Sequence, residues 1–107
     1  MHVIAEQPLR QAARRHLSAT GDITAWRAVA RDARWKSFDD VKQVFGDAEQ
    51  VGDYVIFRIH RKRYRLVTVI HYPGQSKGKT REGHIWIRSF LNNEQFGDPA
   101  NWEKGVL

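Results

Sequence analysis

The chain has 107 residues, carries a formal net charge of +6 and contains no cysteine. This length fits a single domain, 1-107, and the lack of cysteine excludes disulfides, thiolate catalysis and sulfur-ligated zinc sites. No apolar run approaches the roughly 20 residues that cross a bilayer, and the N-terminus lacks the layout of a signal peptide, so we expect a cytoplasmic protein without a membrane partner.

Apolar residues recur at helical spacing through the first half of the chain. The pattern predicts a helix over Glu6–His16 and a second from Asp22 to about Ala33. A third, short helix is expected after Ser37, and Gly46 should end it. Each helix has one apolar side, which we expect to pack against a sheet.

After Gly46 the apolar period changes from helical to alternating. Three strands are predicted, together with a short one around Glu49–Val51: Tyr54–His60, Arg63–His71 and His84–Phe90. Residues 72–83 are rich in glycine and basic residues and are expected to form a loop. The predicted fold is α+β, with N-terminal helices packed on one face of a small antiparallel β-sheet and the other face left for function.

The first hairpin has a predicted register. A turn centred on residues 61–62 would place Phe57 opposite Leu66 in the core and Arg58 opposite Arg65. Like charges directly opposite each other normally destabilise a sheet, and a phosphate between the two guanidiniums would explain the pairing. Because the turn sequence is not a preferred one, a slip of one residue, which would reverse every face, stays an alternative.

Alternation also divides the last strand between two faces. One face carries His84, Trp86, Arg88 and Phe90. Ile85 and Ile87 lie on the other and fit the helix-covered core, so we expect the first set on the open face. Trp86 is expected to be a half-buried packing residue, with base stacking as the alternative.

The positive charge is concentrated in the strands. Residues 54–90 contain nine basic residues and one acidic residue, Glu82, for a net charge of +8. Such a surface attracts polyanions, which favours nucleic-acid binding over a merely solubilising basic face. The candidate RNA-binding residues are Arg61, Lys62, Arg63, Lys77, Lys79 and Arg81.

Cleavage of RNA without a metal needs a base for the 2′-hydroxyl, an acid for the leaving oxygen, and cations that stabilise the charge on phosphorus. Arg58, Arg65 and Arg88 are the candidate catalytic cations. His60 and His84 are the candidates for proton transfer, and the alternative for each is a plain hydrogen-bonding role. No metal-binding motif or glycine-rich phosphate loop is found, so no metal or cofactor is expected.

Four segments, in this order, carry a resemblance to a known family: Val3–Glu6, Tyr54–His60, Arg63–Val67 and Ile85–Phe90. Together they resemble the HigB branch of the RelE superfamily of toxins. The resemblance implies two or three helices against a curved antiparallel sheet. It also implies cleavage of mRNA, usually in the decoding site of the ribosome, and inhibition by a HigA-like antitoxin encoded alongside.

Position by position, the resemblance matches Arg65 and Arg88 to arginines of the family and places Arg58 near a catalytic or RNA-binding cation. One segment departs from the family, because HigB-like sequences commonly have Thr-His-x-x-Tyr-Asp where this chain has Asn92 to Gly97. Asn93 and Phe96 therefore stand where the histidine and tyrosine are expected, and neither transfers a proton.

Three readings of this departure stay open: His60 or His84 supplies the proton transfer, arginine electrostatics suffice, or the nuclease is weak or inactive. The predicted function is a toxin that cleaves mRNA at the ribosome. The alternatives are a non-catalytic RNA- or ribosome-binding module on the same scaffold and, third, a protein-interaction domain, which would leave the basic segment unused.

Overall fold

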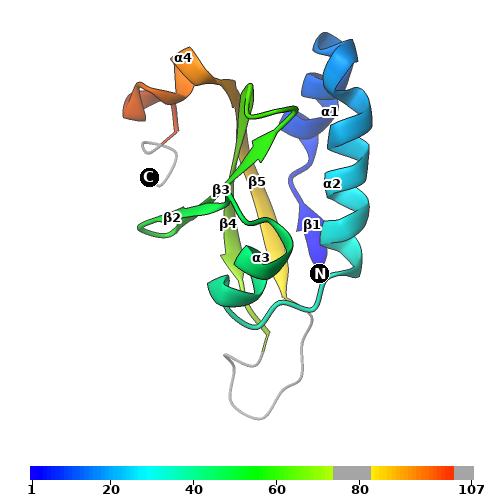
Figure 1. The fold of residues 1–107 in the computed structure, drawn as a ribbon, viewed down its shortest axis with the longest axis vertical. Helices are drawn as coiled ribbons and strands as arrows, with labels where there is room; N and C mark the ends of the chain where they lie inside the picture. Colours follow the sequence, from blue (N-terminus) through cyan, green and yellow to red (C-terminus); the bar gives the residue numbers. More distant parts are fainter. Residues whose placement is uncertain (74–82, 103–107) are drawn as a thin grey trace.

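The computed structural model describes residues 1–73 and 83–102. In chain order the elements are β1 (His2–Ile4), α1 (Gln7–Arg15), a 3₁₀ turn (Leu17–Ala19), α2 (Thr20–Asp32), α3 (Phe38–Val44), β2 (Glu49–Val51), β3 (Tyr54–Ile59), β4 (Tyr64–His71), β5 (His84–Asn92), α4 (Asn93–Phe96) and a second 3₁₀ turn (Pro99–Asn101). The predicted α+β class is confirmed, with α1 and α2 on one side of the sheet and α4 on the other (Figure 1). None of the helices in the described ranges is long and apolar enough to span a membrane.

The sheet has five strands in the order β1-β5-β4-β3-β2. Strands β2 to β5 form the expected antiparallel arrangement, whereas β1 pairs with β5 in parallel. The sequence did not predict β1, because three residues are too few to show an alternating pattern. The strand is held in place by its neighbour and makes the sheet a mixed one.

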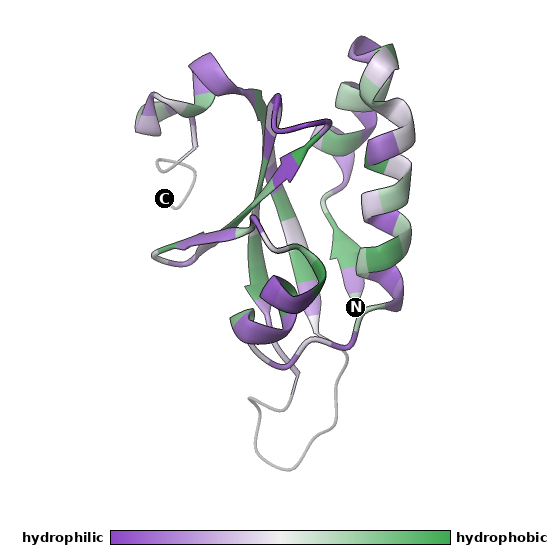
Figure 2. Ribbon diagram, viewed as in Figure 1, coloured by the Kyte–Doolittle hydropathy of each residue, from purple (hydrophilic) through white to green (hydrophobic). Residues whose placement is uncertain are grey.

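The main core lies between the helices and the sheet. Phe57 on β3 is 1 % exposed, and the ring of Trp26 on α2 meets it edge-on with centroids 5.2 Å apart. Ile85 and Ile87 on β5 are buried in the same cluster, as predicted. Figure 2 shows hydrophobic residues concentrated along the strands and hydrophilic ones at α4 and at the hairpin tips.

The predicted hairpin register is confirmed, because Phe57 pairs with Leu66 and Arg58 with Arg65. The slip of one residue was an alternative because residues 61–62 are not a preferred turn sequence, yet the tip adopts the left-handed backbone of such a turn. His60, Arg61 and Lys62 all have positive φ angles, of 54°, 55° and 68°. Left-handed backbone suits the right-handed twist of a hairpin, but it is unfavourable for side chains of this size.

One face assignment on β5 is wrong. Val67 pairs with Ser89 while Thr68 pairs with Ile87, so Arg88 is an extra residue without a partner on β4. This β-bulge reverses the alternation beyond it. Phe90, predicted on the open face, therefore packs against the main core on the helix side.

The second face of the sheet is not fully open, which corrects the expectation that the helices would cover one face and leave the other for function. Tyr54, Ile56, Val67 and Trp102 form a small second core there. The chain reaches this face because β5 continues to Asn92 and is followed directly by α4. The side chain of Asn92 caps this helix, through which the chain reverses. Phe96 stacks on Trp102 with centroids 5.0 Å apart.

Candidate functional site

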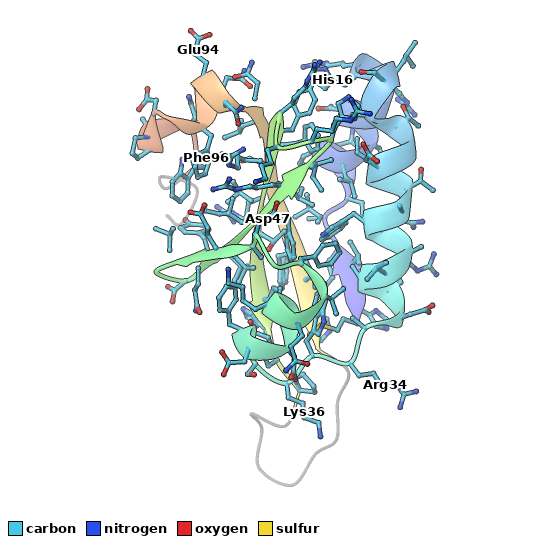
Figure 3. The ribbon with its side chains drawn as sticks, viewed as in Figure 1. His16, Arg34, Lys36, Asp47, Glu94 and Phe96 are labelled. Atoms are coloured by element: carbon cyan, nitrogen blue, oxygen red, sulfur yellow. The ribbon has the colours of Figure 1, made fainter. Side chains whose placement is uncertain are left out.

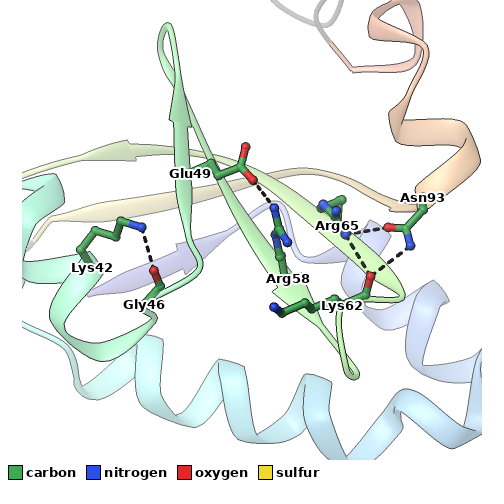
Figure 4. Close-up of polar contacts among 7 residues, drawn as sticks. All are labelled: Lys42, Gly46, Glu49, Arg58, Lys62, Arg65 and Asn93. Atoms are coloured by element: carbon green, nitrogen blue, oxygen red, sulfur yellow. Dashed lines mark hydrogen bonds and ion pairs between the residues drawn. The ribbon is translucent and has the colours of Figure 1, made fainter.

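Two arginines face each other on the side of the sheet away from α1 and α2. Arg58 on β3 and Arg65 on β4 are cross-strand partners, and both are half-buried. Arg58 forms an ion pair through Nη2 with Oε1 of Glu49 on β2, at 2.5 Å (Figure 4). The Nε atom of Arg58 is buried and has no hydrogen-bond partner among residues 1–73 and 83–102.

Arg65 is held in place by contacts from two other segments. Its Nη1 donates to the backbone oxygen of Lys62 at 3.1 Å and to Oδ1 of Asn93 at 2.6 Å (Figure 4). Asn93 closes the network, because its Nδ2 donates to the same Lys62 oxygen at 3.1 Å. The guanidinium also lies 5.4 Å from the ring centre of Phe96. Arg65 is thus fixed by the hairpin tip and by α4.

The two guanidiniums repel each other in a partly desolvated place. The pKa of Arg65 is lowered, first by burial and then by the charge of Arg58, while Glu49 and Asp47 act in the opposite direction. An arginine stays protonated under such a shift, so the repulsion remains. We call Arg58, Arg65, Glu49, Asn93 and Phe96 the arginine cluster.

The candidate histidines lie elsewhere. Nδ1 of His60 is 2.7 Å from Oδ2 of Asp22 on α2, which places its ring toward the helices. His84 lies at the far end of β5, between His2 on β1 and His71 on β4. Neither candidate forms a hydrogen bond or ion pair with Arg58 or Arg65 in the part of the chain that the structure describes.

The remaining candidates are divided among three places. Arg88 lines a separate hollow of about 490 Å³ together with Asp53, Tyr54 and Val69. The hairpin tip exposes Arg61, Lys62 and Arg63. Lys77, Lys79 and Arg81 lie outside the described residues.

Sequence reasoning missed three members of the arginine cluster. Glu49 pairs with Ile56, two residues before Arg58, so the face it shares with Arg58 was deducible once the short strand was expected. Asn93 and Phe96 were singled out only as departures from a family pattern. In the structure both contact Arg65, whereas Glu94 of the same helix points away from the sheet (Figure 3).

Comparison with known protein families gives a match to a toxin family. A family model, HigB_toxin, described as the RelE-like toxic component of a toxin-antitoxin system, matches residues 19–96. No curated protein matches the chain. The matched range runs from the start of α2 to the end of α4 and includes the whole arginine cluster.

Proposed function

The chain belongs to the HigB family of RelE-like toxins, and from this premise we propose that it is an endoribonuclease that cleaves mRNA at the ribosome and so inhibits translation and growth. The observation that carries the proposal is the pairing of Arg58 with Arg65. Like charges directly opposite on a sheet are unfavourable without a counter-charge. Glu49 balances one of the two positive charges, and a phosphodiester between the guanidiniums supplies the second counter-charge with oxygens that arginine forks match.

The arginine cluster also has a group that can remove a proton. Glu49 is in direct contact with Arg58, and its side chain is 44 % exposed. We assign Glu49 as the base that takes the proton of the 2′-hydroxyl. The 2′-oxygen then bonds to phosphorus, the bond to the 5′-oxygen breaks, and the leaving oxygen takes a proton from solvent.

In this scheme Arg58 and Arg65 stabilise the charge that builds on the phosphate oxygens. Asn93 and Phe96 hold the Arg65 guanidinium in position and transfer no proton. The scheme prefers Glu49 to His60 and His84 because Glu49 contacts one of the paired arginines. It uses no metal or other cofactor.

Membership of the family implies a cognate antitoxin. We propose a HigA-like protein that covers the basic face with acidic side chains or blocks entry to the ribosome. The site of action would be the cytoplasm, where mRNA and ribosomes are found.

One observation favours a second candidate function. Asn93 and Phe96 replace the histidine and tyrosine that HigB-like sequences commonly have, and neither group can act as an acid or base. A non-catalytic RNA- or ribosome-binding module would keep the arginines and dispense with those groups.

Expression of the chain without its antitoxin separates the candidates. Growth arrest with newly cut mRNA supports the nuclease, and ribosome association with intact mRNA supports the binding module. Arg14→Ala is the matched control, since this exposed arginine lies on α1, on the opposite side of the sheet. If the protein neither cuts mRNA nor binds RNA, both candidate functions are overturned and a protein-interaction domain is left.

A further inference from the structure

The hollow that contains Arg88 is separate from the arginine cluster but lies on the same face of the sheet. Arg65 pairs with Leu91, and Arg88 lies three residues before Leu91 on β5. The two arginines are therefore roughly 10 Å apart along the strand. RNA whose phosphate lies between Arg58 and Arg65 would thus have a neighbouring nucleotide within reach of the hollow.

The lining of this hollow combines polar side chains with apolar and aromatic ones. Val69 and the buried Tyr54 line it. Trp86 is the cross-strand partner of Val69, one of the lining residues, and keeps 42 % of its surface exposed. A volume of about 490 Å³ is in the range of small-molecule sites and admits one nucleobase with its sugar.

Two charged groups of opposite sign line the hollow without neutralising each other. The bulge leaves Arg88 without a partner on β4, and bulges commonly redirect a side chain. Asp53 is placed by a tight turn in which Gly52 has φ +59°. Across residues 1–73 and 83–102, neither Arg88 nor Asp53 forms an ion pair or side-chain hydrogen bond.

An arginine and a carboxylate in one hollow match guanine better than the other bases. Guanine presents two acceptors, O6 and N7, that an arginine fork binds together. Its Watson–Crick edge presents the N1–H and N2–H groups, which donate to a carboxylate. Adenine has a donor where the arginine fork needs an acceptor, and pyrimidines lack the paired acceptors.

We propose that the hollow is a guanine-binding subsite for single-stranded RNA, in which Arg88 and Asp53 recognise the base and Trp86 offers a stacking surface. The inference rests on the proposed function, because it assigns a sequence preference to the RNA that the arginine cluster binds. Arg88 is then a specificity residue rather than a catalytic one.

The test is equilibrium binding of labelled 2′-O-methyl oligonucleotides, which cannot be cleaved through a 2′-hydroxyl. One oligomer is all uridine and the other has a single central guanine. The wild-type protein should bind the guanine oligomer about tenfold more tightly or better. Arg88→Lys, which keeps the charge and loses the fork, and Asp53→Asn should each reduce this preference to about twofold or less while binding of the uridine oligomer stays similar.

Arg14→Lys on α1 is the matched control and should keep the wild-type preference. Equal binding of both oligomers by the wild-type protein, or a preference that survives Arg88→Lys, overturns the guanine subsite while the nuclease proposal stands if mRNA is still cut. If Arg88→Lys and Asp53→Asn lose affinity for the antitoxin but keep the wild-type RNA preference, the hollow binds the protein partner instead of a base. Failure to bind either oligomer also overturns the guanine subsite, whereas the nuclease proposal is decided separately by whether mRNA is cut on the ribosome.

Discussion

Replacing Arg65 with alanine should abolish RNA cleavage and leave the fold in place. The side chain is fixed by Asn93, by the Lys62 oxygen and by the ring of Phe96, so it requires little rearrangement to meet a phosphate. Loss of such a preorganised charge costs on the order of 3 kcal/mol of transition-state stabilisation, or about a hundredfold in rate.

The expected effect on stability is small because the losses and gains offset each other. Alanine removes two hydrogen bonds of Arg65, each worth about 1 kcal/mol. It also removes the repulsion by Arg58 and the desolvation that lower the pKa of Arg65. We expect a net change within about 1 kcal/mol, which for a domain of this size shifts Tm by roughly 5 °C.

The assay compares single-turnover cleavage at saturating enzyme with thermal unfolding followed by circular dichroism. Arg65→Lys keeps the charge without the fork and should fall between the wild type and the alanine variant. Arg14→Ala controls for loss of a basic residue elsewhere. A folded Arg65→Ala protein with full activity would remove Arg65 from the site, and unfolding of both Arg65 variants would make the residue structural.

Glu49→Gln should keep RNA binding and lower the cleavage rate by about a hundredfold or more, and an unchanged single-turnover rate would exclude Glu49 as the base. Lys62 has a φ of 68°, which glycine adopts without strain, so Lys62→Gly should raise the free energy of unfolding by about 1 kcal/mol while weakening RNA binding. A drop in Tm would refute the strain assigned to the tip. Alanine at Lys77, Lys79 and Arg81 should weaken RNA binding and flatten its salt dependence with the saturated cleavage rate little changed. A large loss of that rate with binding intact would show that the chemistry lies nearer these residues than we propose.

The features that follow from local sequence were predictable. Alternation placed Phe57 and Leu66 in the core, and that register placed Arg58 opposite Arg65 even though the turn has no glycine. Burial of one sheet face fixes the register more strongly than the preference of the turn residues, because a slip would expose every core side chain of the strand.

The features that depend on contacts between distant segments were not predictable. The bulge at Arg88 arises from how β4 and β5 pair, and nothing in the local pattern of β5 marks it. The strand alternation predicted Phe90 on the wrong face for this reason. Likewise, Trp102 covers Tyr54 only because α4 reverses the chain after Asn92.

The same distinction explains why only part of the candidate site could be predicted from the sequence. Paired arginines follow from register, whereas the roles of Asn93 and Phe96 require the position of α4 against the hairpin tip. His60 and His84 attracted attention as residue types that titrate near neutral pH, but the fold directs one toward α2 and places the other at the far end of the sheet.

The most direct test of the central claim is to add the purified protein to ribosomes translating a defined mRNA and to map the new RNA ends. We expect the wild-type protein to produce cuts with 2′,3′-cyclic phosphate and 5′-hydroxyl ends, which the cognate antitoxin suppresses and which are absent with Arg65→Ala. Intact mRNA in the presence of ribosome-bound wild-type protein would contradict the nuclease and favour the binding module.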